Sequence, residues 1–357
     1  MGLNFDYEVL KAYGYHPDIH ISQIGSGLIN RTFLLSQPAK PSAHILQQIN
    51  TDVFKNPEAI AKNIKAIGNF LSLKYPDYLF IKPINTVDGS DMAIVNGAYW
   101  RVLPFIPDTT SLDVLTEPKQ AYEAAKQFGK LSRLLDGFPV EELTPTIPHF
   151  HDLNLRFDQF TQAFYKTTDA LKDLAAAEIG LAFANRPILD YYNTRAQSAA
   201  FPDRVMHHDT KISNVLLHHD GFEGVCVIDL DTIMPGKFIS DLGDMMRTYL
   251  CACNENETDL KKIKIRLPYF EATMKGYLSE MKNILTETEK ELILFSGKYM
   301  IYMQALRFLT DYLNGDIYYP IKYESQNLDR AKNQFKLLHE LFYSEQSLQE
   351  IIDRNLT

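Results

Sequence analysis

The sequence has few cysteines and no long hydrophobic segment. Its three cysteines, Cys226, Cys251 and Cys253, are an odd number, and their spacing suggests neither a disulfide framework nor a zinc site. We therefore expect a reducing, cytoplasmic location. No apolar segment approaches the length of a membrane span, and the N-terminal residues lack the apolar core of a signal peptide. These absences predict a globular protein that has no membrane partner.

An excess of positive charge is also missing. The formal net charge is −9 and the isoelectric point is about 5.6, which argues against a nucleic-acid partner. The hydrophobic fraction of 45% and the charged fraction of 23% are ordinary for a soluble domain. A chain of 357 residues is long enough to form two lobes. Its composition leaves the oligomeric state unknown.

The first hundred residues alternate short β-type segments with turns. Apolar residues at helical spacing predict one helix over 57–73, which begins at a proline. The segments 92–95 and 98–105 flank an Asn-Gly pair, which is typical of a two-residue β-hairpin turn. This part of the chain is therefore expected to form a small sheet with one helix.

The pattern becomes helical after a proline-containing linker at 105–111. Only residues 204–232 interrupt it, with two further β-type segments. We expect an α+β fold with a sheet lobe over 1–104, the linker as a hinge, and a helical lobe over 112–357. The predicted helices of that lobe span 117–138, 152–166, 187–199, 258–282, 287–313 and 326–343.

Four polar residues follow the two β-type segments at spacings that suit phosphoryl transfer. This chemistry needs an aspartate to orient and deprotonate a hydroxyl, oxygen ligands for Mg²⁺, and a cation near the transferred phosphate. In "HHDTKISN", Asp209 and Lys211 fit the first and last roles. Asn214 and Asp229, the latter in "VCVIDLD", fit the role of metal ligands. We expect the carboxylates at 209 and 229 to converge on an acceptor alcohol and a metal-bound triphosphate.

The order of these residues also matches a known pattern. Protein kinases carry H-R-D-L-x-x-x-N followed by D-F-G. His207, Asp209 and Asn214 match the first motif at the same spacing, and Asp229 takes the place of the second motif's aspartate. The conjunction predicts a protein-kinase-like two-lobe fold that binds ATP and Mg²⁺.

One expected group is absent from the nucleotide-binding lobe. Kinases place a lysine on the third strand, whereas "HILQQIN" offers two glutamines. Either a glutamine contacts the phosphates, or a cation such as Lys211 or Arg31 does so. A glycine loop lies between two β-type segments, and the linker backbone suits adenine. The residues expected to contact ATP are Gly25, Ser26, Gly27, Gln47, Pro104, Phe105 and Ile106.

Simpler interpretations accompany several of these residues. A Gly-Ser-Gly sequence is often an ordinary turn, and Asp231 suits the cap of a following helix. His207 is expected to support the loop by hydrogen bonding, and His208 to be exposed or to support neighbouring groups. The pair at 218 and 219 is expected in a solvated turn. A zinc site from these histidines is disfavoured because no helical pair or cysteine partner accompanies them.

Several longer stretches give the sequence a specific resemblance. It resembles the N-acetylhexosamine 1-kinases within the aminoglycoside phosphotransferase/choline kinase superfamily. The resemblance implies that Asp209 is the catalytic base, that Arg307 and Tyr318 contact the sugar, and that a sugar 1-phosphate is the product. A salt bridge from Arg307 to Asp311 is the alternative for that arginine. The matching stretches are 45–54, 149–152, 208–217, 227–236, 241–247 and 307–319.

One departure and two rival functions remain. The family's loop tends to read G-H-I-N, whereas Leu28 replaces the histidine here, which weakens the assignment of an N-acetylhexosamine. A kinase of the same fold could act on choline, an amino alcohol or an aminoglycoside, because cationic substrates favour carboxylates and aromatic faces. A binding module without catalysis is the other rival, and only the missing lysine favours it.

Overall fold

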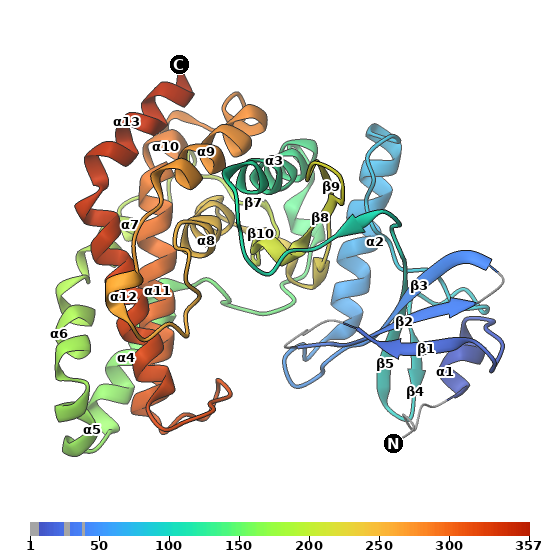
Figure 1. Ribbon diagram of the computed structural model, residues 1–357, viewed down its shortest axis with the longest axis horizontal. Coiled ribbons are helices and arrows are strands. Elements are labelled where there is room, and N and C mark those ends of the chain that lie inside the picture. Colours follow the sequence, from blue (N-terminus) through green and yellow to red (C-terminus); the bar gives the residue numbers. More distant parts are fainter. Residues whose placement is uncertain (1–6, 25–28, 38–39) are drawn as a thin grey trace. The chain divides into compact units, whose positions relative to one another are not determined.

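The computed structural model describes residues 7–24, 29–37 and 40–357, and the chain divides into two compact units (Figure 1). The sheet with its helices belongs to the first unit, and most of the helices belong to the second. The first unit comprises Met1–Thr109, Gly137–Pro148 and Cys226–Pro235, and the second comprises Thr110–Asp136, His149–Val225 and Gly236–Thr357.

The first unit is built on an antiparallel five-stranded sheet of order β1-β2-β3-β5-β4. Apolar side chains of the sheet and of α1 form its core, including Val9, Phe33, Leu46, Trp100 and Val102. Its elements are α1 (Tyr7–Ala12), β1 (His20–Gln23), β2 (Arg31–Gln37), β3 (Lys40–Gln48), α2 (Pro57–Lys74), β4 (Ala93–Val95), β5 (Ala98–Pro104), η1 (Val140–Glu142) and η3 (Leu230–Thr232).

Local chemistry explains the hairpin and the helix that the sequence predicts here. Asn96 and Gly97 both have positive φ, at 51° and 77°, as a two-residue turn between β4 and β5 requires. Pro57 opens α2, and the side chain of Asn56 accepts a hydrogen bond from the amide of Ala59 at 3.1 Å. Both predictions are confirmed.

The second unit is mainly helical. Its elements are α3 (Pro118–Leu134), α4 (Leu153–Lys166), α5 (Asp169–Leu174), α6 (Ala176–Ala184), α7 (Pro187–Asn193), β7 (Arg204–Met206), η2 (Ile212–Asn214), β8 (Val215–His218), α8 (Ile239–Tyr249), η4 (Leu260–Lys262), α9 (Leu267–Met281), α10 (Glu287–Glu291), α11 (Ile293–Leu313), α12 (Gln326–Tyr343) and α13 (Glu345–Leu356). Three short strands, β6 (Thr109–Thr110), β9 (Gly224–Val227) and β10 (Met234–Gly236), lie where the chain passes from one unit to the other.

Helix α11 is the central element of the second unit, and it packs against α4, α8 and α12. The approach of α8 depends on Gly243, because a Cβ there would overlap the carbonyl oxygen of Ser296 in α11. Helix α3 packs along α9. The small antiparallel sheet and the larger helical part together confirm the predicted α+β class.

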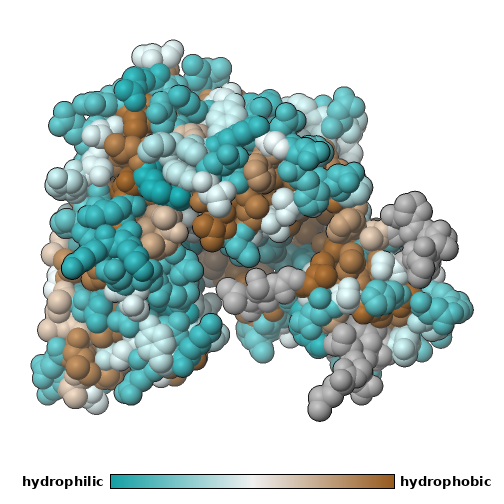
Figure 2. Space-filling view, viewed as in Figure 1, coloured by the Kyte–Doolittle hydropathy of each residue, from teal (hydrophilic) through white to brown (hydrophobic). Residues whose placement is uncertain are grey.

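The surface drawn in Figure 2 is mainly hydrophilic, with hydrophobic patches between. Large exposed apolar side chains include Leu73 on α2 and Tyr165 on α4, at 84% and 75% exposure. Within the described residues, every helix is too short or too polar to cross a membrane.

Candidate active site

The loop after β7 is held in place by helix α8. One carboxylate oxygen of Asp241 accepts a hydrogen bond from the His207 amide at 2.9 Å, and the other accepts one from the His208 amide at 2.7 Å. Burial raises the pKa of Asp241 to about 6, and the nearby His207 and the two amides partly offset that effect. Because His208 has a φ of 66°, a conformation disfavoured for residues with a Cβ, these bonds fix a strained backbone directly before Asp209.

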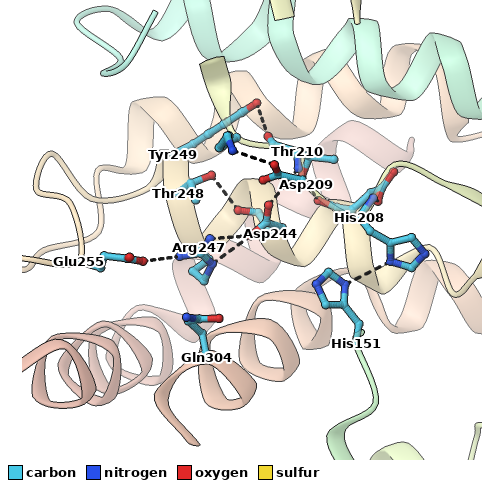
Figure 3. Close-up of polar contacts among 12 residues, drawn as sticks. His151, His208, Asp209, Thr210, Asp244, Arg247, Thr248, Tyr249, Glu255 and Gln304 are labelled. Atoms are coloured by element: carbon cyan, nitrogen blue, oxygen red, sulfur yellow. Dashed lines mark hydrogen bonds and ion pairs between the residues drawn. The ribbon is translucent and has the colours of Figure 1, made fainter. Parts of the chain in front are cut away.

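The next turn of α8 holds the residue after Asp209. Asp244 accepts a hydrogen bond from the Thr210 amide at 2.9 Å, and the Tyr249 hydroxyl donates to the Thr210 carbonyl at 2.8 Å (Figure 3). Arg247 pairs with Asp244 at 2.9 Å and with Glu255 at 3.3 Å. The loop is thus fixed on both sides of Asp209.

Asp209 lies between two donors from its own loop. Its carboxylate accepts a hydrogen bond from Lys211 at 2.7 Å and one from the Asn214 amide group at 2.9 Å. Burial by itself raises the pKa of Asp209, but Lys211, His207 and Asn214 outweigh it and hold the pKa below its ordinary value. The side chain is 25% exposed, so the ionised carboxylate can reach a hydroxyl in solution. The structure therefore brings three of the predicted residues together.

Asn214 has the chemistry of a magnesium ligand. Its amide nitrogen donates to both the carbonyl and the carboxylate of Asp209, so the amide oxygen is left to accept. An amide oxygen and a carboxylate such as that of Asp229 are the hard donors that Mg²⁺ prefers, so the residue types fit this ion. Across 7–24, 29–37 and 40–357, the structure contains no group of three or more His, Cys, Asp or Glu side chains arranged for a metal.

The four histidines of this region have different surroundings. His207 packs edge-on against Phe128 at 5.2 Å between ring centroids, and its Nδ1 accepts a hydrogen bond from the Asp209 amide at 3.3 Å. This agrees with the predicted supporting role. His218 and His219 are both exposed, but only His219 lies in the turn, because His218 is the last residue of β8. His208 is buried at 5% exposure, which rules out the exposed placement.

His208 leads to a group that the sequence interpretation missed. Its Nδ1 lies 3.2 Å from Nδ1 of His151 (Figure 3). The His151 ring stacks on Phe150, with 4.4 Å between the ring centroids. Burial lowers the pKa of His151 well below its ordinary value, and His208 and three arginines lower it further. These arginines are Arg307, Arg247 and Arg156, in decreasing order of effect. The ring of His151 is thus kept neutral by burial, and it contacts His208, which directly precedes Asp209.

Arg307 lies on α11 between two aromatic rings. Its Cζ is 5.6 Å from the ring centroid of Phe150 and 5.5 Å from that of Tyr319. Its Nη1 donates to Gln304 at 3.1 Å, and Gln304 in turn donates to the Tyr319 hydroxyl at 3.3 Å. Within the described part of the chain, Arg307 forms no salt bridge with a carboxylate, although the alternative interpretation expected one with Asp311.

Asp311 instead organises the loop that follows α11. Its carboxylate accepts hydrogen bonds from the backbone amides of residues 317, 318 and 319, and from Asn327, at 2.8–3.1 Å. The salt-bridge alternative is therefore wrong, because the carboxylate is already committed to the loop. Tyr318 is 66% exposed, whereas the neighbouring Tyr319 packs on Arg307. The role of Tyr318 at the sugar stays a prediction.

The predicted nucleotide contacts fall in the first unit. Gly25, Ser26 and Gly27 lie outside the described residues, as does Leu28. Pro104 ends β5, the Phe105 amide donates to the Ala43 carbonyl at 3.3 Å, and the Ile106 carbonyl accepts from Thr109 at 2.8 Å. Their contacts with a nucleotide stay predictions.

Gln47 has a partner that the sequence interpretation did not foresee. Its side-chain oxygen accepts two hydrogen bonds from Arg101, at 2.8 and 2.9 Å, and its nitrogen donates to Thr32 at 3.2 Å. Arg31, the other cation considered for the phosphates, donates to Gln48 at 3.1 Å. Two arginines thus flank the third strand, Arg31 on β2 beside Gln48 and Arg101 on β5 beside Gln47.

Asp229 and Asp231 also differ in their surroundings. Asp229 precedes η3 in a left-handed backbone conformation, with φ 58° and ψ 60°. The sequence suggested that Asp231 caps a helix, but it does not. Its carboxylate forms a buried ion pair with Arg101, and this corrects that interpretation. Asp229 belongs to the first unit and Asp209 to the second, and their convergence stays a prediction.

Two short motifs contain the residues that sequence reasoning left without a role. His151 lies in "HFHD", and Asp241, Asp244 and Arg247 lie in "DLGDMMR". Both stretches belong to the family resemblance, so a signal existed. The resemblance alone did not show what these residues do, because α8 contacts the 207–210 loop, and His151 contacts His208, only in the folded chain.

Residues 20–259 match the family described as the phosphotransferase enzyme family. Solved structures of similar fold include a microcompartment-associated aminopropanol kinase, 14% identical, covering 96% of this chain and 97% of that chain with a TM-score of 0.65. A spectinomycin phosphotransferase in complex with ADP and spectinomycin is 14% identical, over 95% and 97%, with a TM-score of 0.61. An aminoglycoside phosphotransferase from Alicyclobacillus acidocaldarius is 9% identical, over 99% and 98%, with a TM-score of 0.61. These matches confirm the predicted kinase-like fold.

Proposed function

The chain belongs to the phosphotransferase enzyme family, and we propose that it is an ATP-dependent kinase that phosphorylates the C1 hydroxyl of N-acetylhexosamines. The observation that carries this choice of acceptor is Arg307, which has aromatic neighbours and no carboxylate partner among the described residues. The resemblance of the motifs around Asp209, Asp229 and Arg307 to the N-acetylhexosamine 1-kinases supports the same choice.

The charges near Asp209 favour a neutral acceptor over a cation. Three guanidinium groups are close enough to lower the pKa of His151, and only that of Arg247 is paired with carboxylates. Arg156 donates to backbone carbonyls at 3.0 and 3.1 Å, and Arg307 donates to an amide. A quaternary or primary ammonium group would be repelled by Arg156 and Arg307, whereas a neutral sugar would not.

The remaining donors suit a polyhydroxy compound. A guanidinium has five N–H donors in a fixed plane, and Arg307 uses one of them on Gln304. The rings of Phe150 and Tyr319 beside it offer apolar faces for the C–H side of a pyranose. This combination of planar donors with aromatic faces supports sugar binding.

The catalytic residues have distinct tasks in this proposal. Asp209, ionised because of its donors, accepts the hydrogen bond of the acceptor hydroxyl and takes its proton as the new P–O bond forms. Lys211 keeps Asp209 ionised and places a positive charge close to the oxygen that attacks. The strained backbone before Asp209 holds its carboxylate in one orientation, so less conformational entropy is lost on reaching the transition state.

ATP and Mg²⁺ complete the proposed reaction. The ADP complex of the structurally similar spectinomycin phosphotransferase supports an adenine nucleotide as phosphoryl donor. Asn214 and Asp229 would supply oxygen ligands for Mg²⁺, which, when bound, offsets the negative charge of the phosphates. Phosphoryl transfer then gives ADP and the sugar 1-phosphate.

A second candidate is a kinase of the same fold that acts on an amino alcohol, choline or an aminoglycoside. The structurally similar proteins favour it, because they include an aminopropanol kinase and aminoglycoside phosphotransferases. Cationic acceptors need carboxylates or aromatic faces without competing cations. In this chain Asp311 is committed to backbone amides and Asp244 to Arg247 and Thr210.

A substrate panel separates the two candidates. ADP release is measured with N-acetylglucosamine, N-acetylgalactosamine, glucose, galactose, aminopropanol, choline and kanamycin at equal concentrations. We expect turnover with the N-acetylhexosamines and little with the three cationic acceptors. The Asp209→Asn variant is the control, and it should lose about 10²-fold or more of the rate if turnover belongs to this site. Turnover with a cationic acceptor and none with a free sugar would overturn the proposal.

A further inference from the structure

Arg101 forms a buried ion pair inside the first unit. Its side chain lies on β5 at 3% exposure, and it pairs with the carboxylate of Asp231, at 2% exposure. The same guanidinium donates twice to Gln47 on β3, at 2.8 and 2.9 Å. A solvent-free ion pair with added hydrogen bonds contributes little net stability compared with apolar packing, but breaking it on one side is costly. Such an ion pair is therefore better explained by the conformation that it imposes than by net stability.

The second oxygen of Asp231 is also committed. It accepts a hydrogen bond from Asn30 at 2.6 Å, and the Asn30 side-chain oxygen accepts one from the Asn50 amide at 3.0 Å. Asn30 follows the glycine loop in sequence. Both carboxylate oxygens of Asp231 are thus fixed from separate segments of the first unit, so η3 is held firmly at its centre.

A second anchor fixes the chain just beyond Asp231. Asn63, fully buried on α2, donates to the Ile233 carbonyl at 3.0 Å and to the Thr144 carbonyl at 2.8 Å. Asp229, two residues before Asp231, has a φ of 58°. A left-handed conformation of a residue with a Cβ is strained and persists only where the surroundings impose it. The anchors at 231 and 233 supply that constraint.

We propose that Arg101 is a positioning residue for the metal ligand Asp229, acting through its ion pair with Asp231. The inference rests on the proposed function, in which Asp229 binds Mg²⁺ with the nucleotide. Arg101 lies on β5 directly opposite Gln47 of the third strand, in the segment where the sequence has two glutamines. Its side chain is almost wholly buried and already bound to Gln47 and Asp231, so it acts on the conformation of the 229–231 turn and does not contact the phosphates.

Nucleotide binding without an acceptor tests this inference independently of the sugar. The dissociation constant of ADP is measured by calorimetry with Mg²⁺ and with EDTA, and the ratio of the two constants gives the gain from the metal. The variants are Arg101→Met, Arg101→Lys, Asp231→Asn and the double variant Arg101→Met/Asp231→Asn. Arg204→Met is the matched control, because Arg204 forms a similar ion pair with Glu289, at 12% and 0% exposure, in the second unit.

The expected result separates positioning from stability. Arg101→Met should reduce the gain from Mg²⁺ by about 10- to 100-fold, the range typical for lost partners of a metal ligand, and leave metal-free ADP binding within about twofold. Asp231→Asn should act in the same direction, and Arg101→Lys should keep part of the gain. The double variant removes both buried charges, so it should regain thermal stability without regaining the effect of the metal. Arg204→Met should lower the melting temperature alone.

Three results would overturn the inference. An unchanged gain from Mg²⁺ in a less stable Arg101→Met protein would show a purely structural ion pair. An equal loss of ADP affinity with and without the metal would show that Arg101 acts on the nucleotide itself. If the wild-type protein binds ADP equally in Mg²⁺ and in EDTA, Asp229 does not bind a metal with the nucleotide. That result would contradict the metal site of the proposed function itself, without any substitution. If Arg101→Met does not fold, Arg101→Lys and Asp231→Asn give the same comparison.

Discussion

At the scale of single residues, the charge of Asp209 is set by its immediate neighbours. Burial favours the neutral acid, whereas Lys211, His207 and Asn214 favour the carboxylate and prevail. A carboxylate with a lowered pKa is a weak base in the ground state. It suits phosphoryl transfer, in which the hydroxyl becomes acidic only as the bond to phosphorus forms.

The Lys211→Met variant tests this balance through the pH profile. In the wild type the pKa of Asp209 lies below its ordinary value of 3.8, so loss of the base does not limit kcat/KM at pH 5 and above. Without Lys211, burial still raises the pKa of Asp209, and the largest effect that opposes burial is gone. The acid limb should therefore move to higher pH, and the ratio of kcat/KM at pH 5 to that at pH 8 should fall.

Two controls show whether charge is the cause. Lys211→Arg should restore the acid limb, because it keeps a cation near the carboxylate. Lys275→Met removes a lysine that is paired with Glu271 at 2.8 Å on α9, and it should leave the profile unchanged. A Lys211→Met enzyme that is slower at every pH with the same profile would contradict this account of Asp209.

Single residues also show how far sequence reasoning reaches. The spacing of Asp209, Lys211 and Asn214 placed them in one loop, and the structure joins them by hydrogen bonds. The partners of Gln47 and Asp231 could not be predicted this way. Arg101 lies 54 residues from one and 130 from the other, and no local pattern in the sequence links them.

At the scale of elements, some predicted helices match closely, some have the wrong ends and some were missed. The prediction over 258–282 begins well before α9 (Leu267–Met281), and those over 117–138 and 187–199 continue beyond the ends of α3 and α7. The predictions over 57–73, 152–166 and 326–343 coincide with α2, α4 and α12 within one residue. Helix α8 was missed because its polar residues do not form an exposed face. Residues Ile239–Met246 are all buried, including two aspartates. Buried acids do not follow the apolar repeat on which such predictions depend.

The packing of α8 on α11 gives a prediction for stability. Since a Cβ at Gly243 would overlap the Ser296 carbonyl oxygen, Gly243→Ala must push the two helices apart. The cost should be about 2 kcal/mol or more in the free energy of unfolding. Because α8 also carries Asp241 and Asp244, turnover should fall with it. Urea-induced unfolding followed by circular dichroism measures the change.

Helix α6 offers a matched control. A Cβ at Gly180 would meet no atom within 4 Å, and the residue lies inside a helix. Gly180→Ala should therefore be neutral or stabilising by up to about 1 kcal/mol, because alanine is the better helix former. Equal effects of the two substitutions would show that the contact between α8 and α11 is not tight.

At the scale of the whole molecule, the net charge does not show where the cations lie. The chain carries a formal charge of −9, yet Arg156, Arg247 and Arg307 gather near His151. The sequence predicted the α+β class and the kinase-like fold. It did not predict that residues 226–235, which include Asp229, would belong to the unit of the sheet, because that follows from contacts with Arg101 and Asn63.

The identity of the phosphorylated product tests the central claim most directly. The protein is incubated with ATP, Mg²⁺ and either N-acetylglucosamine or N-acetylgalactosamine, and the product is examined by phosphorus and proton NMR. We expect one equivalent of ADP per sugar phosphate, with the phosphorus coupled to the proton at C1. Phosphate on another hydroxyl, or no sugar phosphate from a protein that phosphorylates an amino alcohol or an aminoglycoside, would contradict the proposed function.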